Sequence, residues 1–314
     1  MHLGFQRAGY TTVAAVEQDL NATTTMRQNF SNANVYQCDV KDFLERHQNQ
    51  AARHALGRID HIHSSSPCCG FSGANICGGA NDKKNNDLSL CLIEAARIFM
   101  PTSLTFENVL GMWRRKNVHY LKTIVKELLR LGYQVRVVEV RSCDYGSPQI
   151  RPRIVLSATF RSAPRPQLPA KTHGDSDGLL PYVVPIDVLS CLEGSPGTHG
   201  TRLHHHRGRR EERSDLERLD ANRLAPTICA SSKPLVHYKF NRYLAVSECG
   251  VVQGLPTTFK FYGSMRHQRI QVGNAVPVEL STAIALAAKK VLDFEYIDDD
   301  PTMDDELQDM ERAS

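Results

Sequence analysis

Short apolar runs alternate with amphipathic segments through the first half of the chain, and this alternation constrains the fold most. Four segments have the pattern and length of strands, at residues 11–16, 58–64, 103–106 and 135–140, and residues 58–64 alternate apolar and polar side chains. Two segments place apolar side chains on one helical stripe, residues 88–99 and 118–131; Pro101 ends the first and Gly132 the second. Strands alternating with helices predict an α/β fold with a doubly wound, mostly parallel sheet.

Three chemically capable residues follow predicted strands. Glu17 comes directly after residues 11–16, Cys68 lies in the turn-rich stretch after residues 58–64, and Glu107 follows residues 103–106. In a doubly wound sheet, ligands collect at the carboxyl ends of the strands. We therefore expect these three side chains to lie along one edge of the sheet.

The pattern changes at about residue 157. Residues 157–217 contain prolines, His/Arg clusters and few periodic apolar residues, which indicates a small lobe. Regular signals resume at residues 224–230 and lead to a helix predicted over 278–291. The acidic residues 298–314 predict a disordered tail. The sequence thus predicts four regions: 1–156, 157–217, 218–297 and 298–314.

Charge is distributed unevenly along the chain. Residues 298–314 carry eight acids and one arginine, a balance of −7, so the rest sums to +11 within a net charge of +4. A basic body suits a polyanionic partner such as nucleic acid, although a solvated basic face gives the same charge.

Membrane, secretory and metal-binding classes find no support in the sequence. No apolar run is long enough to span a bilayer, and the amino end lacks the regions of a signal peptide. The nine cysteines include no C-x-x-C pair, a common zinc-site spacing, so we expect no metal centre. We expect an intracellular protein, nuclear if the source is eukaryotic.

A series of short motifs occurs in order along the chain. It comprises Pro67-Cys68-Cys69-Gly70-Phe71-Ser72, Phe106-Glu107-Asn108-Val109, Gln149-Ile150-Arg151-Pro152-Arg153, Arg218-Leu219-Asp220, Pro226-Thr227-Ile228, Gln253-Gly254-Leu255-Pro256 and Gln271-Val272-Gly273-Asn274-Ala275-Val276-Pro277. In order and spacing the series resembles the cytosine-C5 DNA methyltransferase family over residues 3–290. The resemblance implies a Rossmann-like, class I methyltransferase domain in residues 1–156 and 218–297. It also implies a small target-recognition lobe in residues 157–217.

The resemblance implies a role for four residues in the reaction. Cytosine C5 is a poor nucleophile, so the chemistry needs a thiolate that adds at C6 and an acid at N3. Cys68 matches the thiolate and Glu107 the acid, while Arg153 and Arg151 match the residues that grip the base. The planar guanidinium of arginine suits that grip. The cytosine must also leave the stack of double-stranded DNA.

The resemblance also implies S-adenosyl-L-methionine as the methyl donor. An acid after a strand, Glu17, matches the group that accepts the ribose hydroxyls. The other residues that match cofactor-binding positions are Asp39, Val40, Pro67, Asn274 and Val276.

The amino end departs from the family pattern. The family opens with Asp-x-Phe-x-Gly-x-Gly-Gly, whereas residues 1–10 resemble the stretch after those glycines. The family's strand order makes the missing strand central, so its two neighbours should keep unpaired backbone groups. We expect a truncated chain that is poorly folded or inactive. A start set at an internal methionine of a longer protein explains the intact later motifs better than a degenerate gene does.

Two further departures leave alternatives open. Cys69 stands where the family usually has glutamine and is a rival thiol, although the register with Pro67 favours Cys68. The small lobe, with basic candidates such as Arg202 and Arg207, also occurs in the tRNA-methylating branch of the family. The competing functions are therefore a tRNA cytosine-C5 methyltransferase and a DNA-binding remnant without catalysis. The lack of the tRNA branch's Cys-Phe-Thr favours DNA.

Overall fold

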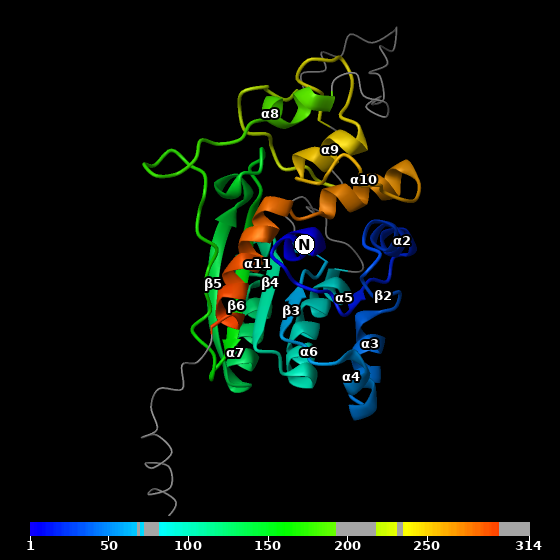
Figure 1. Cartoon of the computed structure of the whole chain (residues 1–314), viewed down its shortest axis with the longest axis vertical. Coiled ribbons are helices and arrows are strands. Elements are labelled where there is room, and N and C mark those ends of the chain that lie inside the picture. Colours follow the sequence, from blue (N-terminus) through cyan, green and yellow to red (C-terminus); the bar gives the residue numbers. More distant parts are fainter. Residues whose placement is uncertain (68–69, 72–81, 193–217, 231–234, 295–314) are drawn as a thin grey trace, which may run out of the picture.

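The computed structural model describes residues 1–67, 70–71, 82–192, 218–230 and 235–294, and their strands form two sheets (Figure 1). The smaller sheet pairs β1 (Ala15–Val16) with β2 (Val35–Tyr36) in parallel. The larger sheet has the order β3-β4-β6-β5. Its strands are β3 (His61–Ser64), β4 (Ser103–Asn108), β5 (Tyr133–Arg141) and β6 (Pro152–Phe160). The α/β class is confirmed.

The larger sheet is mixed, which corrects the expectation of a mostly parallel one. β3 and β4 are parallel, but β6 runs antiparallel to both β4 and β5. A parallel pair needs a long crossover, whereas a short connection reverses the chain. Residues 142–151 make that reversal through the 3₁₀ turn η3 (Ser142–Tyr145) and Gly146, whose φ is +95°. Sequence analysis missed β6 because an apolar run with no alternation does not distinguish a strand from a buried helix.

Helices cover both faces of the larger sheet. They are α1 (His2–Arg7), α6 (Cys91–Phe99), α7 (Val118–Arg130) and α11 (Val278–Leu292). Side chains such as Leu104 and Phe106 join a core with α6 and α7. Val140 and Val155 instead join a core with α1 and α11. Alternate strand residues therefore point to opposite layers, as a pleated strand requires.

The predicted helices are largely confirmed. The stripe over residues 118–131 is α7, and the helix expected over 278–291 is α11. The segment 88–99 begins as a 3₁₀ turn, η1 (Leu88–Leu90), before it continues as α6. The other helices of the amino-terminal half are α2 (Leu20–Asn29), α3 (Val40–His47), α4 (Gln50–Leu56) and α5 (Asp82–Asp87).

The two sheets separate between β1 and β3. Among the described strands β1 pairs only with β2, and β3 only with β4. Within the described part of the chain, β1 and β3 therefore each have a strand neighbour on one side only, and a missing strand between them stays a prediction. The ring of Phe5, on α1, lies 5.2 Å from the rings of His61 and His63 on β3.

A second, smaller core lies above one end of the larger sheet in Figure 1. Its helical elements are α8 (Pro185–Leu189), the 3₁₀ turn η4 (Ser190–Leu192) and α9 (Val246–Val252). The helix α10 (Met265–Asn274) contacts α9. Leu189 packs in this core together with Leu219, Leu244 and Val252. The small core therefore draws on residues from both sides of position 218, and the exact region boundaries stay a prediction.

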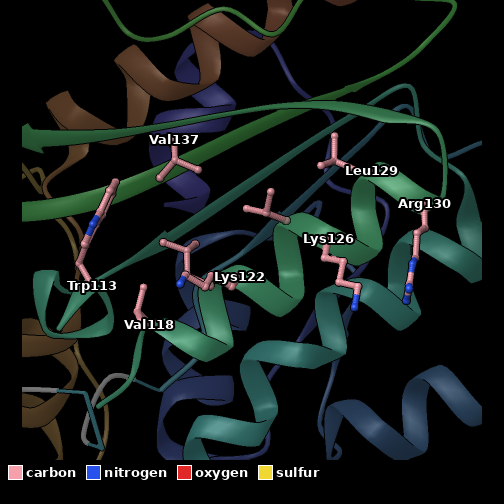
Figure 2. A pocket seen from close by; sticks show the side chains of 9 residues that line it. Trp113, Val118, Lys122, Lys126, Leu129, Arg130 and Val137 are labelled. Atoms are coloured by element: carbon pink, nitrogen blue, oxygen red, sulfur yellow. The ribbon is translucent and has the colours of Figure 1, made fainter. Parts of the chain in front are cut away.

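An apolar groove of about 700 Å³ runs between α7 and β5 (Figure 2). Its nine lining residues are Trp113, Val118, Leu121, Lys122, Val125, Lys126, Leu129, Arg130 and Val137. None of them is a predicted site residue, so the groove is separate from the predicted chemistry. Within the described ranges, no helix is both long and apolar enough to cross a membrane.

Candidate active site

Glu107 and Arg153 form a buried ion pair at the edge of the larger sheet. Glu107 lies near the end of β4 and Arg153 near the start of β6, and the antiparallel register pairs the flanking residues Asn108 and Ile154. Arg153 Nε is 2.7 Å from Glu107 Oε1, and the two side chains are 8% and 6% exposed. Two buried charges are tolerated only when each compensates the other, so loss of either side chain would leave an uncompensated charge in the protein interior.

The two oxygens of Glu107 are used differently. Oε2 accepts a hydrogen bond from Ser65 Oγ at 3.1 Å. Oε1 is close to Arg153 but makes no aligned hydrogen bond within the described part of the chain. We interpret the short distance between Arg153 Nε and Glu107 Oε1 as an ionic contact. Because the contact is not aligned as a hydrogen bond, Oε1 can still accept one. A buried acceptor without an aligned donor is costly, which makes Oε1 a position where a ligand donor is favoured.

Asn108 ties the segment before Pro67 to the end of β4. Its Nδ2 donates to Ser66 O at 3.3 Å and to Ser66 Oγ at 3.0 Å. Its Oδ1 accepts from Val109 N at 2.8 Å. Asn108 belongs to one of the sequence motifs, but no role was predicted for it. The structure gives it one, which is to fix the loop beside Glu107.

The other side of the same loop is fixed by packing. Phe71 is 1% exposed and belongs to the core under α6 and α7. Gly111 approaches it so closely that any Cβ would collide with the carbonyl oxygen of Phe71. Cys68 and Cys69 themselves lie outside the described residues, so their predicted roles stay predictions.

Arg151 bonds to the protein backbone from a position that is 2% exposed. Its Nη1 donates to Ile228 O at 2.7 Å and its Nη2 to Gly273 O at 2.9 Å. These contacts join the start of β6 to the returning part of the chain. The predicted grip of Arg151 on a base stays a prediction, and Arg153 is the arginine that reaches Glu107.

Two buried glutamines, neither assigned a role from the sequence, complete this junction. Gln149 Nε2 donates to Gln253 Oε1 at 2.9 Å, and Gln149 Oε1 accepts from Ile228 N at 3.2 Å. Gln253 Nε2 donates to Val272 O at 2.8 Å. Glutamines that are 0% exposed must bond internally, and here they connect segments far apart in sequence.

Two carboxylates predicted to bind a cofactor lie at the same end of the smaller sheet. The register pairs Val16 with Tyr36, so Glu17 and Asp39 follow neighbouring strand ends. Glu17 Oε1 accepts from Asp19 N at 2.8 Å, and Asp39 Oδ1 accepts from Lys41 N at 2.9 Å. Each carboxylate keeps a second oxygen for a hydroxyl or amino group of a ligand. This donor set fits the ribose and adenine of a nucleoside.

The remaining predicted cofactor residues differ in exposure. Asn274 ends α10 and is exposed, and Pro67 is exposed beside the candidate site. Val40 begins α3 directly after Asp39. Val276 is 6% exposed and packs in the core with α1 and α11. The contact of each of these residues with a cofactor stays a prediction.

The model of the family described as C-5 cytosine-specific DNA methylase matches residues 1–178 and 193–290. The chain belongs to this family. It is 29% identical over 318 residues to the type II methyltransferase M1.HphI of Haemophilus parahaemolyticus, covering 92% of this chain and 83% of the relative. It is also 29% identical over 327 residues to M.FnuDI of Fusobacterium nucleatum, covering 93% and 92%.

Solved structures share the fold of this methylase. A DNA modification methyltransferase encoded within an E. coli prophage superposes with a TM-score of 0.72 at 20% identity, over 93% of this chain and 96% of that one. The Dnmt2 methyltransferase of S. pombe superposes with a TM-score of 0.61 at 15% identity, over 94% and 96%. At these identities the likeness concerns the fold alone.

Because it belongs to this family, the chain is a DNA methyltransferase. The Glu107–Arg153 pair is therefore considered as part of a methyltransferase active site. The pair is the only described site where a predicted acid and a predicted arginine meet. No group of three possible metal ligands occurs among the described residues.

Proposed function

We propose that this methyltransferase transfers a methyl group from S-adenosyl-L-methionine to C5 of a cytosine extruded from double-stranded DNA. The observation that carries the proposal is the buried Glu107–Arg153 pair beside the anchored segment that leads to Cys68. Such a pair supplies both an acceptor and a rigid cationic fork to a flat polar ring. Cytosine presents a ring nitrogen and an exocyclic amino group on one edge, which suit the carboxyl group of Glu107, and a carbonyl oxygen that suits the guanidinium of Arg153.

The thiolate of Cys68 adds to C6 of the extruded base and forms an S–C bond. The electron pair of the C5–C6 double bond moves onto C5 and is delocalised through C4 to N3, where Glu107 stabilises it by holding a proton. C5 becomes nucleophilic as a result and would accept the methyl group that the donor supplies, with the bonding pair left on the donor sulfur. Loss of the C5 proton to water then returns the electron pair, breaks the S–C bond and frees the thiolate.

Arg153 orients both Glu107 and the base in this scheme. Its ion pair fixes the carboxylate, and its Nη1 donates to Pro152 O at 2.7 Å, so Nη2 is the nitrogen that we assign to the base. Arg151 supports the start of β6 through Ile228 and Gly273, so that Arg153 stays in register. The charge of the base-binding edge therefore depends on two arginines with different tasks.

The cofactor residues of the proposal come from the strand ends of the smaller sheet, the segment after β3 and the connection between α10 and α11. Glu17, Asp39 and Val40 would hold the nucleoside, while Pro67, Asn274 and Val276 would line the methionine side. When bound, S-adenosyl-L-methionine supplies an electrophilic methyl group on a sulfonium. The support is the pair of carboxylates at neighbouring strand ends, each with an oxygen available to a hydroxyl or amine.

Double-stranded DNA is the proposed substrate, since the family description names a DNA methylase and the chain before residue 298 is basic. The arginine-rich residues 202–210 lie outside the described ranges, and their contact with phosphates stays a prediction. Base extrusion follows from the need of a thiolate to approach C6 from outside the stacked helix.

The test measures tritium transfer from labelled S-adenosyl-L-methionine to double-stranded DNA and to tRNA. It uses the 314-residue chain and the same chain extended by the codons that precede Met1. We expect transfer to DNA from the extended protein, complete loss in its Cys68→Ser variant, and retention in the matched control Cys69→Ser. Transfer to tRNA alone would contradict the DNA assignment. Loss in Cys69→Ser only would move the nucleophile, and no transfer from either protein would leave a DNA-binding remnant.

A further inference from the structure

A row of hydroxyl and imidazole groups lies between β3 and β4 beneath Glu107. The parallel register pairs His61 with Ser103 and His63 with Thr105. Because side chains alternate between the faces of a strand, these groups share one face with Ser65 and Glu107. We call Ser103, His61, Thr105, His63 and Ser65 the histidine relay.

Each member of the histidine relay is within hydrogen-bonding distance of the next. The distances are 2.6 Å from Ser103 Oγ to His61 Nδ1, 2.9 Å from His61 Nε2 to Thr105 Oγ1, 2.8 Å from Thr105 Oγ1 to His63 Nδ1, 2.8 Å from His63 Nε2 to Ser65 Oγ and 3.1 Å from Ser65 Oγ to Glu107 Oε2. Both ring nitrogens of each histidine are therefore engaged, and the row is continuous.

The carboxylate at one end fixes the direction of every hydrogen bond in the row. An ionised glutamate only accepts, so Ser65 donates to Glu107 and must accept from His63 Nε2–H. His63 Nδ1 is then an acceptor, and the hydroxyl of Thr105 donates to it. Thr105 in turn accepts from His61 Nε2–H, which leaves His61 Nδ1 to accept from Ser103. All members donate toward Glu107, and both histidines carry the proton on Nε2.

This pattern requires neutral imidazoles, and the surroundings provide them. Burial lowers the pKa of His61 to about 3 and that of His63 well below its usual 6.5. The rings face Phe5 and Tyr10 of the amino-terminal segment. The other ionisable group near His63 is the α-amino group of Met1, whose pKa burial lowers to about 6.

The two ends of the histidine relay open to different environments. His61 lines a polar cavity of about 640 Å³ at the start of β3, together with Arg58, Asp60 and Thr102. Ser65, at the other end, is exposed beside Glu107. A nucleotide in contact with Glu107 would cover Ser65, and the cavity beside His61 would then be the remaining path to water.

We propose that the histidine relay carries a proton between Glu107 and the cavity beside His61. The proposal rests on the proposed role of Glu107 at N3 of cytosine. One proton from water or a buffer acid in the cavity enters at the His61 end of the row, each group passes one proton on, and Glu107 Oε2 gains one. Both histidines change from the Nε2–H to the Nδ1–H tautomer. The reverse transfer, when the product leaves, restores them, so the row needs no separate reset.

The first test reads the tautomers directly and does not require activity. Two-bond ¹⁵N–¹H spectra of the whole protein should show Nε2–H for His61 and His63. In Glu107→Gln the amide oxygen stays toward the Arg153 donor, and the amide nitrogen therefore donates to Ser65. Every bond of the row should then reverse, and both histidines should show Nδ1–H. Unchanged tautomers in Glu107→Gln would overturn the relay.

A second substitution locates the connection between the two histidines. In the double variant with Glu107→Gln and Thr105→Val, His63 should still reverse but His61 should remain Nε2–H, because Thr105 supplies the only hydroxyl between them among the described residues. Reversal of both histidines in the double variant would show that they are coupled by another path, and the proposed row would be wrong.

The third test concerns turnover on DNA. Thr105→Val should lower kcat about tenfold, toward the lower end of proton-transfer effects, with KM for DNA unchanged. Thr105→Ser, which restores the hydroxyl, should recover kcat. The matched control is Thr159→Val, another buried strand threonine, whose hydroxyl bonds to Pro164 O. Equal loss in both valine variants, or no recovery in Thr105→Ser, would leave Thr105 a structural residue. If no protein transfers methyl groups while the tautomers still reverse, the proposed function fails and the relay stands.

Discussion

The two sheets of this methyltransferase differ in how firmly they are built. β4 has a neighbour on each side and is buried along its full length, whereas β1 and β2 are two residues each and only partly buried. The candidate catalytic pair lies on the larger sheet, and the carboxylates proposed to bind the nucleoside follow the smaller one. Rigid support is thus concentrated where angles between reacting groups matter most.

The largest expected difference between the sheets is in the cost of removing apolar volume. Leu104→Ala on β4 deletes a side chain that is 0% exposed and should lower the free energy of unfolding by about 2–5 kcal/mol. Val35→Ala on β2, a partly buried position, should cost less than about 1 kcal/mol. Urea denaturation of both variants measures the difference. Equal costs would mean that the two sheets are supported equally well.

The pH dependence of stability tests the larger sheet separately, because it reports on the buried histidines His61 and His63 of β3. The folded pKa values of His61 and His63 lie below 6.5, so between about pH 6.5 and the folded values only the unfolded chain binds their protons. Stability should therefore fall on acidification from pH 6.5, by up to about 1.4 kcal/mol per pH unit for each imidazole. Urea midpoints at pH 7, 6 and 5 measure this slope. His61→Gln should flatten it, and an unchanged slope would contradict the burial of that ring.

The smallest effect concerns the helix cap of Asp39 beside the smaller sheet. Asp39→Ala removes the acceptor for Lys41 N and should destabilise the protein by about 1 kcal/mol. Asp39→Ser keeps a capping oxygen and should restore stability while it still weakens binding of S-adenosyl-L-methionine, measured by calorimetry. Normal cofactor affinity in Asp39→Ser would confine Asp39 to capping.

The sequence predicted the elements whose patterns are local. α7 and α11 follow continuous apolar stripes, and β3 and β4 follow strand-length runs, so their order was correct. β6 was missed because its direction depends on a tertiary reversal rather than on its own composition. The split between the sheets was expected only through the family's strand order, since no residue in β1 or β3 signals it.

Within the site, motif resemblance found the residues but not their partners. Glu107 and Arg153 were both selected, and their contact depends on the antiparallel register of β4 and β6. Ser65, His61 and His63 were not selected, because hydroxyl and imidazole side chains carry no periodic signal. Their alignment appears only once β3 is registered against β4.

The chain reversal at Gly146 determines which end of β6 lies beside Glu107, and therefore whether Arg153 can reach it. β4 finishes where β6 starts, so a residue at the outset of one strand stands beside a residue at the close of another. Were β6 threaded the opposite way, Arg153 would emerge roughly 20 Å away, at the far rim of the sheet. One turn between two strands thus determines whether a carboxylate gains a cationic neighbour or remains alone.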